Sequence, residues 1–273
     1  MAEPDLPPTS ADQEAPGDPD QSAARSARVY NYWLGGEDNF PVDRAVGDAV
    51  MQKLPQTRKL VRGNREFLER AVHFICGEGI SQIVDLGSGF PSPRPTVDEL
   101  ARKYDPGTAI AYVDHDPVVV ERWREVRADD RITAVLGDVR DPQPILAQPG
   151  ICELIDWDRP TGVLCVGLFN FVHGDIAEMA GAFRSRMAPG SYLAVSHLTT
   201  TGTSPNALAH ILGSYEGEDE ARPVFRDASE IERVFGGWPL VQPGLVDITQ
   251  WRPPVAPGEP SIVQCLAGVA QAP

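Results

Sequence analysis

Residues 83–91 read IVDLGSGFP, and this stretch decides how the rest of the chain is interpreted. Ile83 and Leu86 are strand formers, so the stretch is typical of a buried strand that runs directly into a glycine loop. Gly87 and Gly89 allow sharp turns and let a ligand approach where a Cβ would collide. Ligands of doubly wound α/β sheets bind at this carboxyl edge of the strands. The alternative is a turn that binds nothing, and the other features of the chain have to decide between the two.

Composition and charge limit the classes of protein to which the chain can belong. Its 273 residues are enough for one α/β domain with an appendage. No apolar run approaches the roughly 20 residues that a membrane-spanning helix needs, and the N-terminus lacks the basic and apolar regions of a secretory signal. We therefore expect a cytoplasmic protein that does not bind membranes. The formal net charge of -15 disfavours binding to nucleic acid.

The chain has four cysteines that lie far apart and form no C-x-x-C pair: Cys76, Cys152, Cys165 and Cys265. Cys165 falls within an apolar run that is typical of a strand. This spacing favours buried, reduced thiols over disulfides or a zinc site, and we expect no bound metal.

The residues before the first strand predict an acidic tail and three helices. Residues 1–24 contain six acids among prolines, with no basic residue and no aromatic, which is typical of a disordered tail. Helical patterns follow at 26–34, from Pro41 onward, and at 57–76, where Gly35 and the glycines after Cys76 end the first and third helices. Residues 25–79 therefore form a helical cap, which by composition alone could be only a packing appendage.

The residues after the glycine loop separate two classes of ligand. Thr96 and Glu99 fit a capping box, so a helix begins at Thr96, after a proline-rich loop. A dinucleotide needs a helix that opens directly from the glycines, with a third glycine for close packing, and that glycine is missing. The second strand ends at Asp114, which could bind the ribose hydroxyls of an adenosine ligand or could simply form a turn.

The next three strands bring further polar residues to the same edge. Asp138 follows the third strand, where it and the backbone of Val139 could bind an adenine, unless Asp138 is a solvated turn residue. The apolar fourth strand leads to Asn170 and His173, and the fifth ends at His197. Either histidine is a candidate general base, although packed or capping histidines are common.

The last third of the chain predicts an insertion and a pair of antiparallel strands. Residues 199–226 are polar and mixed, which favours an insertion over the ligand edge, with a short helix near 207–215. LVDITQW and SIVQCLAGVA are the last two strands, and the proline-rich connection between them favours antiparallel pairing. The alternation of strands and helices predicts an α/β fold.

These features together resemble the class I methyltransferases. Five segments are more closely similar to a bacterial family called S-adenosyl methyltransferases: RVYNYWLGGEDNFPVDRA, RGNREFL, VDLGSGFP, YVDHDP and GLVDITQWRP. The resemblance runs from about Ser26 to the C-terminus. It implies a Rossmann-like domain over residues 80–273, with a mostly parallel seven-stranded sheet whose last strand is antiparallel. It also implies S-adenosyl-L-methionine as the cofactor.

The resemblance further implies roles for particular residues. It puts the methionine part of the cofactor beside Asp85, Gly87, Ser88 and Gly89, the ribose on Asp114, and the adenine between His115, Asp138 and Val139. The cap of residues 25–79 becomes a lid, and the residues expected to contact the acceptor or the methionine end are Tyr32, Asp38, Asn39 and Asn170.

The predicted function is in-line transfer of a methyl group to an unidentified small-molecule acceptor. Holding the acceptor in line and excluding water can supply about 7 to 11 kcal/mol in the most favourable systems. His173 is the candidate catalytic base if the acceptor must lose a proton. A protein that binds S-adenosylmethionine without catalysis and an NAD(P)-dependent oxidoreductase remain the alternatives, and the sequence predicts no oligomeric state.

Overall fold

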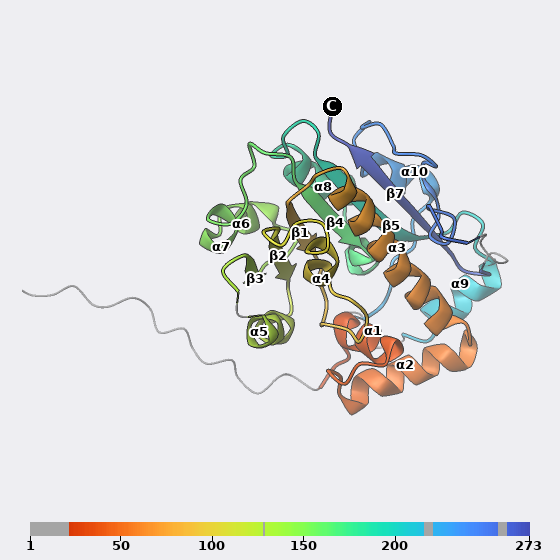
Figure 1. Ribbon diagram of the computed structural model, residues 1–273. Helices are drawn as coiled ribbons and strands as arrows, with labels where there is room; N and C mark the ends of the chain where they lie inside the picture. Colours follow the sequence, from red (N-terminus) through yellow and green to blue (C-terminus); the bar gives the residue numbers. More distant parts are fainter. Residues whose placement is uncertain (1–21, 128, 216–220, 256–260) are drawn as a thin grey trace, which may run out of the picture.

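The structure is a computed structural model that describes residues 22–127, 129–215, 221–255 and 261–273 (Figure 1). Residues 1–21 of the predicted acidic tail lie outside the described residues. Within the described part, seven strands form one sheet: β1 (Gln82–Leu86), β2 (Ala109–Asp114), β3 (Ile132–Leu136), β4 (Gly162–Val166), β5 (Tyr192–Thr199), β6 (Val246–Asp247) and β7 (Gln264–Gln271).

The strand order is β3-β2-β1-β4-β5-β7-β6, with β7 antiparallel to both of its neighbours. The first five strands pair in parallel, which confirms the predicted mixed sheet. One detail differs from the expectation, because β6 has only two residues and β7 pairs mainly with β5. The side chain of Asp247 accepts hydrogen bonds from Thr249 N (2.9 Å) and Oγ1 (2.5 Å), and this turn ends the strand early.

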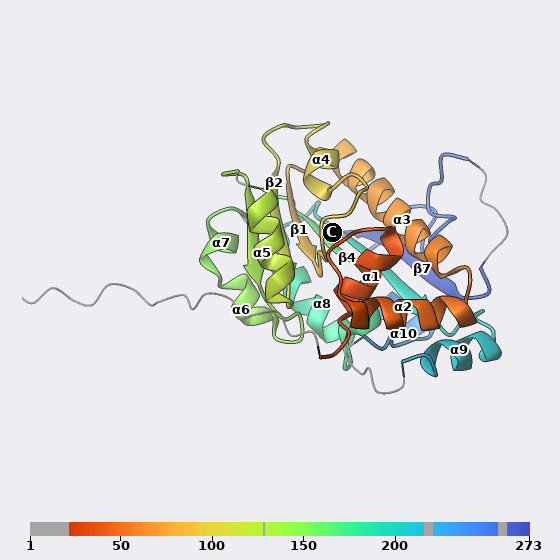
Figure 2. The same cartoon turned by 90° about the horizontal axis from the view of Figure 1, so that it is seen from below.

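Helices cover both faces of the sheet (Figures 1 and 2). One face packs against α3, α4 and α5, and the other against α6, α7, α8 and the residues Val234 and Phe235 that follow α10. The helices are α1 (Ser26–Leu34), α2 (Pro41–Lys53), α3 (Thr57–Gly77), α4 (Val97–Ala101), α5 (Pro117–Val126), α6 (Pro142–Leu146), α7 (Pro149–Cys152), α8 (Ile176–Arg184), α9 (Pro205–Leu212) and α10 (Ala228–Arg233), with a 3-10 turn η1 (Leu168–Phe171). The predicted capping box at Thr96 is present, and Asp227 with Glu230 forms another at the start of α10.

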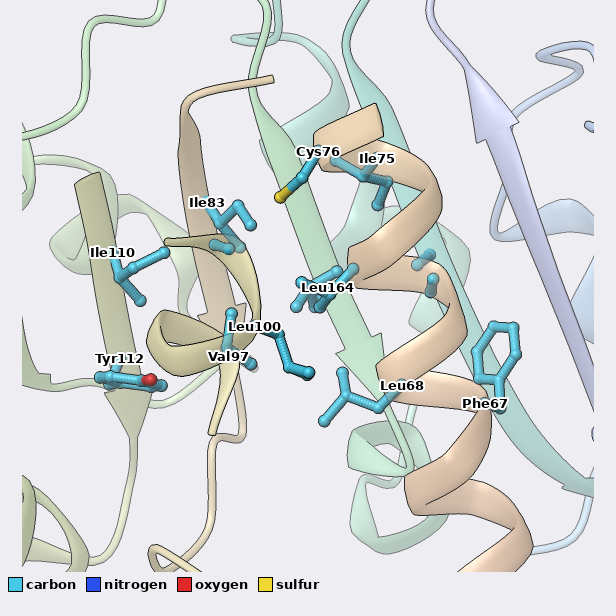
Figure 3. Packing of buried hydrophobic residues seen from close by; sticks show 14 of the residues in the cluster. Phe67, Leu68, Ile75, Cys76, Ile83, Val97, Leu100, Ile110, Tyr112 and Leu164 are labelled. Atoms are coloured by element: carbon cyan, nitrogen blue, oxygen red, sulfur yellow. The ribbon is translucent and has the colours of Figure 1, made fainter. Parts of the chain in front are cut away.

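Helix α3 joins the cap to the sheet. Its apolar side buries Phe67, Leu68 and Ile75, and it lies across Ile83 of β1 and Leu164 of β4 (Figure 3). Replacing one such buried side chain by alanine typically costs about 2 to 5 kcal/mol, because a cavity remains. The third predicted helix is therefore part of the sheet's own core as well as part of the cap.

Helices α1 and α2 lie at the carboxyl edge of the parallel strands (Figures 1 and 2). Helix α1 ends as predicted at Gly35, which has a left-handed backbone (φ 83°) and donates its N–H to Asn31 O and Tyr32 O. Trp33 of α1 and Val50 of α2 are buried in a separate apolar cluster that also includes Ile211 of α9. The insertion after β5 thus packs against the cap, and both lie near the edge where the glycine loop begins.

Candidate active site

A cavity of about 450 Å³ lies between the glycine loop, helices α1 and α3, and the segments that follow β2, β3 and β4. Nine of the residues predicted for the site line it together: Asp85, Gly87, Ser88, Gly89, Asp114, His115, Asp138, Val139 and His173. These residues end or follow four different strands. The strands are parallel, so their carboxyl ends, and the residues that follow them, lie at the same edge of the sheet.

The glycine loop is held in place by the neighbouring strand. Gly87 donates its N–H to Val113 O (2.8 Å), and Trp123 Nε1 donates to Gly89 O (2.7 Å). Both glycines have left-handed backbones, with φ 68° at Gly87 and 59° at Gly89. A Cβ on Gly87 would also fall 2.6 Å from Leu168 Cδ1, so a larger residue there would strain the backbone and displace the Leu168 side chain.

Asp114 shapes the loop and also lines the cavity. Its Oδ2 accepts the N–H of Gly89 (2.9 Å), its Oδ1 accepts the N–H of Asp116 (3.0 Å), and the residue is 4% exposed. The predicted turn role and the predicted ligand role are therefore compatible, because each carboxylate oxygen can accept a second hydrogen bond. The hydrogen bond from His115 to Asp114 raises the pKa of His115.

Asp85 is a buried acid at the end of β1. The pKa of Asp85 is raised to about 7, chiefly by burial, while the charge of Arg65 opposes the shift and the charge of Asp114 adds to it. A nearby cation would favour the ionised form of such a carboxyl group. The position is therefore suited to binding a cationic group of a ligand.

Three polar atoms on cavity-lining residues are buried and have no hydrogen-bond partner within the described part of the chain: Asn31 Nδ2, Arg65 Nε and Ser88 Oγ. Arg65 is fixed by the proline-rich loop, because its Nη2 donates to Pro95 O (2.6 Å). Such atoms are costly to bury without a partner, so they indicate a ligand that supplies one. Sequence reasoning missed Arg65, although it lies within the RGNREFL segment.

A chain of hydrogen bonds crosses from the cap to the sheet edge. Asn64 Nδ2 donates to Tyr30 Oη (2.9 Å), Ser196 Oγ donates to Asn64 Oδ1 (2.5 Å), and Gly167 N donates to Ser196 Oγ (2.9 Å). Burial raises the pKa of Tyr30 to about 12, so its hydroxyl stays protonated. Sequence analysis did not single out Asn64, because its role depends on three separate elements meeting.

The cap residues predicted for the lid lie outside the cavity lining. Tyr32 Oη donates to Asp48 Oδ1 (2.7 Å), and Asp38 pairs with Arg122 of α5 (3.2 Å). Asn39 Nδ2 donates to Gly36 O and to Oδ1 of Asn31, a residue of α1 that does line the cavity (2.9 Å each). These three residues organise the cap and fix it to α5, whereas the cap's contribution to the cavity wall comes from other residues of α1 and α3.

Two residues expected at the edge are directed elsewhere. Asn170 Oδ1 accepts the N–H of Leu198 (2.8 Å), and Asn170 does not line this cavity. His197 is fully buried, with Nδ1 2.6 Å from Leu198 O and Nε2 2.8 Å from Arg226 Nη1. Burial lowers the pKa of His197 to about 4, so His197 is a neutral, packed residue of the interior. His173 is exposed and lines the cavity.

The far end of the cavity carries an ion pair. Arg140 donates through Nε to both oxygens of Asp138 (2.9 Å each), and this contact lowers the pKa of Asp138. Asp138 remains partly exposed, and Val139 beside it is buried and lines the cavity. The backbone N–H of Arg140 also donates to Asp138 Oδ1 (2.9 Å) and its Nη2 donates to Oδ2, so three donors of Arg140 share this carboxylate.

The strand order and the cavity at this edge define a class I methyltransferase fold. A candidate methyltransferase from Thermobifida fusca is 36% identical and superposes with a TM-score of 0.86 over 93% of this chain and 96% of that chain. A DUF574 family protein from Streptomyces avermitilis is 30% identical, with a TM-score of 0.86 over 92% of this chain and 98% of that chain. No curated protein matches the chain.

The chain belongs to the S-adenosyl methyltransferase family, whose sequence model matches residues 12–273. The match begins earlier than the motifs indicated, inside the acidic segment. The protein is therefore an S-adenosylmethionine-dependent methyltransferase by family and fold, and S-adenosylmethionine is its cofactor. In the described residues, no helix is long and apolar enough to cross a membrane, and no group of three metal-binding side chains occurs.

Proposed function

We propose that this protein transfers the methyl group of S-adenosylmethionine to a small-molecule acceptor in the cavity beside the glycine loop. The observation that carries the proposal is the combination, in one cavity of about 450 Å³, of two buried acids with three buried polar atoms that lack partners among the described residues. This volume lies in the range of about 300 to 1,000 Å³ that is usual for small-molecule sites.

The polar groups of the cavity fit the cofactor from end to end. Asp85 suits the ammonium of the methionine part, and Arg65 suits its carboxylate, because the guanidinium retains an unpartnered Nε in the described chain. Asp114 suits the ribose hydroxyls. Asp138 and Val139 suit the adenine, because the first accepts hydrogen bonds and the second offers an apolar surface.

The cap and the sheet domain have different roles in this proposal. Residues 25–79 act as a lid on the domain of residues 80–273, and Asn31 of α1 and Arg65 of α3 face the cavity from the lid. When bound, the cofactor supplies an electrophilic methyl group on its sulfonium. The lid excludes water and orients the reactants, which is where most of the rate gain of such a transfer arises.

Proton handling in the cavity falls to His173. This histidine lines the cavity and is exposed, so it can exchange a proton with water if the acceptor must lose one. The Tyr30 hydroxyl has a pKa of about 12, so it acts as a hydrogen-bonding group and not as a base.

Calorimetric titration of the full chain tests the proposal. We expect saturable binding of S-adenosylhomocysteine and no comparable binding of NAD. With S-adenosylmethionine carrying a labelled methyl group, we expect label to enter the small-molecule fraction of a cell extract. Saturable NAD binding without a response to the adenosyl ligand would overturn the methyltransferase proposal, and binding without any label transfer would favour the non-catalytic alternative.

A further inference from the structure

A second cavity of about 60 Å³ adjoins the first and shares three of its wall residues, Tyr30, Asn64 and Phe171. It lies among the cap helices α1 to α3, the turn η1, the end of β5, the helix α9 and the strand β7. Most of these elements belong to the cap and to the insertion after β5, and the sheet supplies only its margin. The second cavity is therefore formed mainly by the cap and by the insertion after β5, and only to a small extent by the sheet.

The wall of the second cavity is apolar. Its shared boundary is the Tyr30 and Asn64 pair, whose side chains already bond to each other and to Val61 O and Ser196. Thr57 Oγ1 donates to Leu54 O (2.7 Å). Asn170, Tyr215 and Cys265 also line it, and the rest of the lining is mainly aliphatic and aromatic, as at Trp33, Val50, Leu60 and Ile211. An occupant gains little from polar groups there and gains most from apolar surface.

The size of the cavity limits its occupant further. One water-sized group needs about 10 to 15 Å³ of cavity volume. A cavity of 60 Å³ therefore accommodates about four non-hydrogen atoms. A branched aliphatic group of that size fits, whereas a fused ring system does not. Its apolar wall offers few hydrogen-bond partners to water, so replacing water there by an apolar group is favourable.

We propose that the second cavity binds a compact, branched aliphatic end of the methyl acceptor. The acceptor then extends past Tyr30 and Asn64 into the cofactor cavity, where its nucleophile meets the methyl group. Tyr30, Asn64 and Phe171 line both cavities, so they form the boundary that such an acceptor crosses. This inference rests on the proposed methyltransferase function and adds to it the chemical class of the acceptor.

The test uses 2-methylpropan-1-ol as a probe, with glycerol as a polar comparison, on the full chain saturated with S-adenosylhomocysteine. Methyl NMR spectra should show saturable shifts at Leu60, Leu198 and Ile211 with the branched alcohol and none with glycerol. Nuclear Overhauser contacts should link the hydroxymethyl protons of the alcohol to the homocysteine methylenes. Binding without these contacts would overturn the acceptor role of the cavity.

Two substitutions at one position provide the second arm. Val61→Phe adds four carbon atoms to a residue that lines the second cavity but not the first, and Val61→Ile adds one. We expect the affinity for the alcohol to fall at least tenfold in Val61→Phe and about two- to threefold in Val61→Ile. The affinity for S-adenosylhomocysteine should be unchanged in both variants. Val46→Ile, in the same apolar cluster but lining neither cavity, is the matched control and should leave both affinities unchanged.

The outcomes separate the two proposals. If the wild-type protein fails to bind S-adenosylhomocysteine, the proposed function itself is wrong. If the adenosyl ligand binds but the branched alcohol does not, or binds equally well to Val61→Phe and Val61→Ile, only the acceptor class is wrong.

Discussion

Asp85 and Arg65 are the two cavity residues whose chemistry depends most on burial. Asp85 is 5% exposed, and the buried Nε atom of Arg65 has no hydrogen-bond partner in the described part of the chain. Partly unpaired charges at the edge of a sheet are costly to maintain, and they are typical of sites where a ligand completes the pairing.

Arg65→Gln should weaken S-adenosylhomocysteine binding at least tenfold. The physical reason is the loss of a charge-assisted hydrogen bond to the carboxylate, which is worth about 1.5 to 3 kcal/mol. Binding of 5′-methylthioadenosine, which lacks the amino-acid part, should be unchanged. Calorimetry with both ligands measures the difference. Arg62→Gln, on an exposed position of the same helix, is the control, and an equal loss for both ligands would contradict the assignment.

Asp85 makes stability depend on pH. Its pKa is about 7 in the folded protein and 3.8 ordinarily, so the folded state holds a proton that the unfolded state releases between these values. Its contribution is therefore fully present below pH 3.8 and is lost as the pH rises through 7. The asparagine side chain cannot ionise, so Asp85→Asn should become more stable relative to the wild type as the pH rises. The difference in unfolding free energy between the two proteins should shift by about 3 kcal/mol in favour of Asp85→Asn from about pH 5 to about pH 8. Urea unfolding at both pH values measures this gain, and a constant difference would contradict it.

Asp114→Ala should damage both binding and folding. The substitution removes the acceptor for two backbone N–H groups, those of Gly89 and Asp116, as well as the proposed ribose contact. Leaving buried donors unpaired costs about 1 to 3 kcal/mol each, so a lower melting temperature should accompany a tenfold or greater loss of S-adenosylhomocysteine affinity. Melting curves and calorimetry report the two effects. Weakened binding with unchanged melting would show that the turn tolerates the loss.

At the scale of elements, two ion pairs connect the cap to the β2 and α5 region. Arg28 and Asp116 lie 3.2 Å apart and are 3% and 6% exposed, whereas Asp38 and Arg122 at the same distance are 28% and 42% exposed. Breaking a buried pair leaves an uncompensated charge, while exposed pairs contribute little. The cap should therefore depend on the Arg28 contact much more than on Asp38.

Arg28→Met should lower the unfolding free energy by about 3 to 5 kcal/mol and weaken S-adenosylhomocysteine binding, because α1 forms part of the cavity wall. Asp38→Asn should change the unfolding free energy by less than about 1 kcal/mol. Chemical denaturation and calorimetry of both variants test the comparison. A larger effect at Asp38 would restore it as a residue of direct importance to the ligand.

At the scale of the whole molecule, the charge is unevenly distributed along the chain. Six of the 39 acids lie in residues 1–21, which contain no basic residue, and the chain as a whole carries -15. Ala24, by contrast, is fully buried, so the cap begins before α1. A truncation that preserves the fold should therefore stop at residue 21.

Deleting residues 1–21 should leave the S-adenosylhomocysteine affinity within twofold of the wild type and the melting temperature within a few degrees, because the segment has too little apolar surface to form a core. Deleting residues 1–34, which also removes α1, should abolish binding, since α1 lines the cavity. Calorimetry and melting curves distinguish the two. Loss of binding in the shorter deletion would assign the acidic segment a role in the site.

The sequence by itself determined the sheet, most of its helices and the edge at which the candidate site lies. Strand periodicity, capping boxes such as Thr96 with Glu99, and glycines such as Gly87 act over a few residues, so they can be identified without knowing what packs against them. The carboxyl ends of parallel strands then meet at one edge for topological reasons, which is why Asp85 and Asp114 could be placed together.

Only the tertiary structure decided which side chains face the cavity. Arg65 and Asn64 lie on a long amphipathic helix, and their direction depends on how α3 packs against the sheet and the proline-rich loop. Asn170 and His197 stand at the predicted edge, yet hydrogen bonds to Leu198 and Arg226 turn them into the interior. Local sequence sets the backbone of each element, whereas side-chain direction at a junction depends on all the elements that meet there.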